Sequence, residues 1–145
     1  MASSRRVPIR LRAATVPLCL SCLVVNCQTT GPTVPEARFV VHARNGIVPY
    51  YETFRIVLRD PAEIAKAERV LSGGQPMVVA GRLVAGDGGF NAPWSWHLKP
   101  DSTWLTGMVI ELCEGIPSAV EQDLEGWLQY GLLCVTTAEI VARER

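Results

Sequence analysis

The sequence predicts an α+β domain, in which a curved antiparallel sheet or small open barrel carries two helices packed against it. Short segments in which apolar and polar residues alternate predict strands, and two segments with helical spacing are bounded by capping and stop signals. The expected order is β-β-α-β-β-β-α-β. The 145 residues carry a formal net charge of 0. This size favours one modest domain, and the charge balance gives no basic face for nucleic acid.

The first half of the domain holds two predicted strands and a helix. Residues 38–43 and 50–59 alternate as strands, and Asn45-Gly46 between them predicts a tight hairpin turn. Asp60 is a good N-cap, and Ser72-Gly73-Gly74 ends the helix. Its expected apolar face consists of Ile64, Ala65, Ala67, Val70 and Leu71.

The centre of the chain predicts a second hairpin. Residues 77–84 form a strand that ends in the glycine-rich loop 86–91, and residues 94–98 alternate again. Residues 99–102 then predict a turn, followed by a return strand over 104–113. In this hairpin His97 and Glu111 would share a polar face.

The end of the domain predicts one helix and one strand. Ser118 and Glu121 have the spacing of a capping box, and the helix runs to about Leu128. Residues 132–142 return as a strand that carries Cys134.

The N-terminus predicts export. Four arginines precede an apolar stretch over residues 13–25 that is too short to span a bilayer. Cys27 follows as the expected lipidation site of a lipoprotein, and Cys22 is a second candidate. We therefore expect a signal over 1–26, a Thr/Pro/Gly tether over 27–37 and a domain over 38–145. The alternatives are an ordinary cleavage site nearby or a cytosolic protein with a disordered basic tail.

Five cysteines are present, and three of them lie in or next to the signal. The remaining pair, Cys113 and Cys134, suits one disulfide in an oxidising compartment. Two free, buried thiols are the alternative.

A motif in the centre of the chain resembles a family of small, mostly uncharacterised domains. They occur in exported bacterial proteins and as the N-terminal domain of a eukaryotic calmodulin-binding protein. The resemblance covers about residues 54–144. It departs at Glu114, where the family usually has Asp, and at 134–136, where it has Cys-Pro-Trp. It implies no activity, because calmodulin binding belongs to one member. The matching residues are Asn91, Trp94, Ser95, His97, Leu98, Pro100, Asp101, Glu111 and Cys113.

Three functions are compatible with these features. We rank first a non-catalytic binding module of the cell envelope, with a membrane partner through its lipid anchor and a small ligand or envelope protein as the second partner. A structural or inhibitory envelope protein ranks second. A hydrolase using His97 and Glu111, with help from Asp101 or Asn91, ranks third. No cofactor or metal is expected, since one His and one Glu are too few for zinc. The candidate ligand contacts are Asn91, Trp94, Trp96, His97 and Asp101.

Overall fold

The computed structural model describes residues 35–46, 50–109 and 111–145, and for Glu111 it describes only the backbone. These residues belong to one compact unit, Pro32–Arg145. The expected signal (1–26), its Cys27 and most of the tether (27–37) lie outside the described residues.

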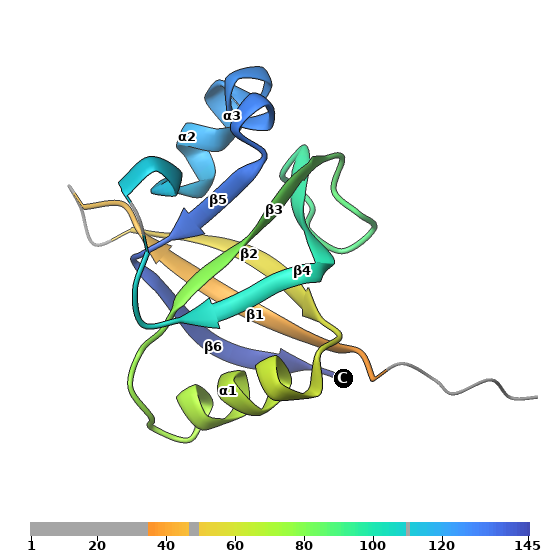
Figure 1. Ribbon diagram of the computed structural model, residues 1–145, viewed down its shortest axis with the longest axis vertical. Helices are drawn as coiled ribbons and strands as arrows, with labels where there is room; N and C mark the ends of the chain where they lie inside the picture. Colours follow the sequence, from red (N-terminus) through yellow and green to blue (C-terminus); the bar gives the residue numbers. More distant parts are fainter. Residues whose placement is uncertain (1–34, 47–49, 110) are drawn as a thin grey trace, which may run out of the picture. The chain divides into compact units, whose positions relative to one another are not determined.

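The described strands form two three-stranded antiparallel sheets, which are not closed into a barrel (Figure 1). The first sheet has the order β2-β1-β6, with β1 at Ala37–Arg44, β2 at Tyr51–Leu58 and β6 at Ala138–Glu144. The second has the order β4-β3-β5, with β3 at Val78–Ala85, β4 at Trp96–Thr106 and β5 at Leu132–Val135. Three α-helices and one short 3₁₀ helix complete the described part of the chain, so the predicted α+β class is confirmed.

One hydrophobic core joins both sheets and the first helix. In β1 every second residue is buried, as the alternation predicts for a strand with one face in the core. Phe39 and Val41 are fully buried from β1, and Trp96 and Leu98 from β4.

Helix α1, Pro61–Leu71, forms as its capping signals predict. The Asp60 carboxylate accepts a hydrogen bond from the Ala62 amide at 2.8 Å, and Gly73 after the helix has a φ of 89°. Ala67 is buried on the apolar face, but Ala65 is exposed, so its predicted place on that face is wrong. The Glu63 carboxylate accepts from the Leu105 amide at 2.7 Å and so connects α1 to β4.

The predicted central hairpin is wrong, because residues 99–102 do not reverse the chain. Leu83 pairs with Leu98 and Gly81 pairs with Thr103, so four residues of β4 stand opposite the single residue Arg82. The predicted turn chemistry is present, since the Thr103 hydroxyl donates to the Lys99 carbonyl at 2.9 Å. It produces a wide bulge inside one continuous strand, however, and the partner of β4 is β3.

The first turn and the last helix also differ from expectation. Six residues connect β1 to β2, so the tight Asn45-Gly46 turn is wrong. The predicted helix is broken at Asp123 into α2, Pro117–Gln122, and α3, Leu124–Tyr130.

The predicted capping box does not form, because both of its side chains bind other elements. Ser118 donates from its amide and its hydroxyl to the Glu52 carboxylate. Glu121 accepts from the amide and hydroxyl of Ser95. Long-range partners therefore replace the local ones.

The predicted final strand is two strands. The chain turns at Thr136-Thr137, and β5 joins one sheet while β6 joins the other. The Thr137 hydroxyl donates to the Arg44 carbonyl at 3.0 Å and holds this turn against β1.

A disulfide joins Cys113 to Cys134, as the cysteine count predicts. Cys113 ends the 3₁₀ helix η1, Glu111–Cys113, and Cys134 lies in β5. The bond therefore fastens the segment after β4 to the edge of the second sheet.

Candidate functional site

The glycine-rich loop after β3 brings a histidine and a phenylalanine together. Gly86, Gly88 and Gly89 all have positive φ values. A Cβ on Gly88 would lie 2.8 Å from both the His97 Cγ and the Phe90 Cε1. Only glycine therefore lets the loop backbone approach both rings.

His97 has a defined ring orientation. Its Nδ1 lies 2.6 Å from the Gly86 carbonyl oxygen, and its ring meets the Phe90 ring edge-on with the two centroids 5.4 Å apart. Because a carbonyl can only accept, Nδ1 carries the hydrogen, and in the neutral ring Nε2 is left as an acceptor. The half-buried side chain thus offers one acceptor nitrogen in a fixed position.

Asn91 is a structural clamp. It is fully buried, its side-chain oxygen accepts from the Arg55 amide at 2.7 Å, and its amide group donates to the Trp96 carbonyl at 2.8 Å. These bonds join β2 to the start of β4. Its predicted role as a ligand contact is therefore wrong, because no polar atom of the side chain is left at the surface.

The two tryptophans do not form an exposed aromatic platform. Trp96 is fully buried against Phe54 and Trp94, with ring centroids 5.9 and 6.0 Å apart. Trp94 is half-buried, and its indole nitrogen donates to the Thr53 carbonyl at 2.8 Å. Trp96 is thus excluded as a surface contact because the core encloses it.

Charged side chains lie in a chain of ion pairs beside His97. Glu36 contacts Arg38 at 3.6 Å and Arg59 at 3.0 Å, and Arg59 also contacts Asp101 at 3.3 Å. Hydrogen bonds to Glu36 and then to Asp101 raise the pKa of the Arg59 guanidinium above its ordinary value. The guanidinium is thus held between two carboxylates at the surface.

These groups line one open polar hollow of about 310 Å³, which we call the motif cleft. It brings together His97 and Asp101, two of the residues predicted from the sequence, and adds charged residues from β1 and β2 that carry no local signal. Its lining comprises Glu36, Arg38, Val57, Arg59, Gly88, Phe90, His97, Lys99, Pro100 and Asp101.

The expected pairing of His97 with Glu111 loses its basis. His97 pairs with Val84 near one end of β3, whereas Thr106 pairs with Val78 near the other, and Glu111 follows after β4 has ended. These two β3 partners are six residues apart, or about 20 Å along an extended strand. The hairpin that would have placed both side chains on one face is absent.

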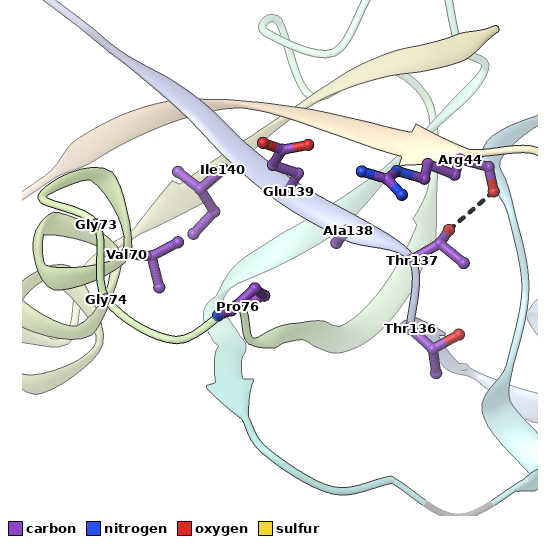
Figure 2. Close-up of a pocket in the computed structure, with 10 residues that line it drawn as sticks. All are labelled: Arg44, Val70, Gly73, Gly74, Pro76, Thr136, Thr137, Ala138, Glu139 and Ile140. Carbon is purple, nitrogen blue, oxygen red and sulfur yellow. Dashed lines mark hydrogen bonds between the residues drawn. The ribbon is translucent and has the colours of Figure 1, made fainter. Parts of the chain in front are cut away.

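Two further hollows have no counterpart in the sequence analysis. One, of about 380 Å³, is apolar and is lined by Trp104, Met108 and the disulfide among others. The other, of about 540 Å³, lies beside the start of β6, and we call it the β6 groove (Figure 2). Its remaining walls come from Arg44, Val70 and the loop 73–76.

Within the described residues, no group of three or more His, Cys, Asp or Glu side chains is placed to hold a metal ion. None of the described helices combines the length and apolarity needed to cross a membrane.

The motif and the fold place the chain in a family. A family model described as the BP-74 N-terminal domain, after a calmodulin-binding protein, matches residues 36–145, and the chain therefore belongs to this domain family. This finding confirms the resemblance drawn from the central motif. Searches of curated proteins and of solved structures found no match.

Proposed function

We propose that this domain is a non-catalytic binding module of the cell envelope, and that its motif cleft binds a hydroxyl-rich ligand such as an envelope saccharide. The observation that carries the proposal is the row of alternating cations and carboxylates beside His97 and Phe90. An open hollow with a few convergent polar groups and an aromatic ring suits a small polar ligand.

The charge pattern favours hydroxyl groups over a simple anion. A phosphate or carboxylate would have to compete with Glu36 and Asp101 for the Arg59 guanidinium. A hydroxyl group can instead donate to a carboxylate and accept from a guanidinium at the same time. The His97 Nε2 offers one further acceptor, which suits a hydroxyl donor but not an anion.

Titration calorimetry and amide NMR shifts of the purified protein would test this binding. The probes are N-acetylglucosamine, its trisaccharide, maltotriose and inorganic phosphate. We expect a saccharide to shift the amides of 88–101, and Asp101→Asn to weaken its binding about tenfold, because one charged hydrogen-bond acceptor is lost. Glu125→Gln, on the exposed face of α3, is the matched control.

Two results would contradict the saccharide proposal. One is a response of the cleft to phosphate but to none of the sugars. The other is saccharide binding that Asp101→Asn leaves unchanged, since the ligand would then lie elsewhere.

The same proposal places the domain outside the cytoplasm, attached to a membrane through a lipid on Cys27. The basic and apolar N-terminal segments support it, and the Cys113–Cys134 disulfide is in keeping with an oxidising compartment. Intact-mass analysis of the membrane fraction of its own host should find a chain that starts at Cys27 with acyl mass. Cys27→Ser should lack that mass. A chain that retains Met1 or Ala2 would overturn the export proposal.

A further inference from the structure

Strand β6 has a free edge that borders the β6 groove. Among the described strands its only hydrogen-bonded neighbour is β1, which lies on its other side. The groove runs along β6 from the turn at Thr136 to Ile140. At about 3.4 Å per residue, this edge is about 14 Å long.

The register shows which backbone groups point to this edge. The Arg44 amide donates to the Thr137 carbonyl at 3.4 Å, so these two residues form a hydrogen-bonded pair. In an antiparallel ladder such pairs alternate with non-hydrogen-bonded ones. The next pair, Ala43 with Ala138, is therefore of the second kind, and so is Val41 with Ile140.

The N–H and C=O groups of Ala138 and Ile140 consequently point away from β1 and toward the groove. No bond from these groups to another described residue is found outside the β1–β6 ladder. Two donors and two acceptors thus repeat at a spacing of two residues, which is the pattern that an extended peptide backbone complements.

The walls of the groove differ in polarity on the two sides of this edge. Ala138 and Ile140 are 6 % and 4 % exposed, whereas Thr137 and Glu139 between them are exposed. Val70 adds to the apolar side. Figure 2 shows Ile140 and Val70 on the α1 side of β6, with the Arg44 and Glu139 side chains away from them. An added strand would thus meet apolar and charged rows alternately.

We propose that the β6 groove binds an extended peptide, which adds to β6 as a further strand and carries aliphatic residues at alternate positions. The aliphatic side chains lie against Val70 and Ile140, and the residues between them lie on the side of Arg44 and Glu139. A second copy of this chain is a poorer occupant, because the end of α1 and the loop 73–76 stand beside the edge and leave room for a single strand.

Amide hydrogen exchange of the protein would test this inference. The probes are three capped hexapeptides in which valine alternates with serine, lysine or glutamate. We expect at least one of them to slow exchange of the Ala138 and Ile140 amides at least tenfold, because each amide gains an acceptor. The preference among the three reports which charge dominates beside Arg44 and Glu139.

Two variants and one control make the test specific. Ala138→Pro removes a donor of the free edge but no bond to β1, so it should abolish peptide binding and keep the fold. Val70→Thr keeps the volume of the wall and should weaken binding several-fold through its added hydroxyl. Glu125→Gln on α3 should bind normally.

Three results would overturn the proposal. These are no protection by any hexapeptide, protection that a folded Ala138→Pro variant retains, and loss of edge exchange through concentration-dependent dimerisation alone. The groove shares no residue with the motif cleft. A failure of saccharides to bind would therefore leave this inference standing.

Discussion

The two sides of the segment from Asn91 to Asp101 make different contributions to the molecule. One side, with Asn91, Trp96 and Leu98, is buried completely and joins the second sheet to the first. The other side, with His97 and Asp101, lines the open motif cleft. A single family motif therefore mixes residues that build the fold with residues that are available to a ligand.

This difference has an energetic form. Buried residues contribute to stability because they fill space or satisfy buried hydrogen bonds. Exposed charges contribute little to stability, since solvent screens their ion pairs. Substitutions on the two sides should therefore separate into losses of stability and losses of binding.

Trp96→Ala should have the largest effect. It removes a fully buried ring that contacts Phe54 and Trp94, so we expect a loss of roughly 3–5 kcal/mol in the free energy of unfolding. Urea unfolding followed by circular dichroism measures it. Trp104→Ala, at a residue that is 36 % exposed, is the matched control with a smaller loss. A loss below about 1 kcal/mol at Trp96 would remove the distinction between the two sides.

Asn91→Ala should have the next largest effect. It leaves the Arg55 amide and the Trp96 carbonyl without their partner, and we expect a loss of about 2–3 kcal/mol by the same measurement. Ser102→Ala removes an exposed hydroxyl bond and should stay within about 0.5 kcal/mol. If Asn91→Ala were as stable as wild type but failed to bind saccharide, Asn91 would belong to the cleft after all.

Asp101→Asn should have the smallest effect on stability. Its side chain is 61 % exposed, and its ion pair with Arg59 is a surface one, so the change should stay within about 0.5 kcal/mol. Saccharide binding to the same variant should nevertheless fall. Destabilisation comparable to that of Asn91→Ala would show that the ion-pair row supports the fold.

Local signals were sufficient where an element depends on its own residues. Asp60 and Gly73 bound α1 as predicted, because a capping carboxylate and a positive φ act within a few residues. The alternation of β1 and the pairing of Cys113 with Cys134 were likewise readable from the chain. His97 and Asp101 were identified as candidates through the motif, and both line the cleft.

Tertiary structure decided every feature that depends on a distant partner. Residues 99–102 carry turn chemistry whether they reverse the chain or bulge within a strand, and the pairing of β4 with β3 selected the bulge. Ser118 and Glu121 bonded to Glu52 and Ser95 rather than to their own helix.

The same reason explains what the sequence determined about the site and what it did not. Composition and motif identified polar residues in the centre of the chain. Burial of Asn91 and Trp96, and the arrival of Glu36, Arg38 and Arg59 beside His97, required the packing of strands far apart in sequence. The free edge of β6 exists only because the last strands belong to different sheets, which no local pattern of residues specifies.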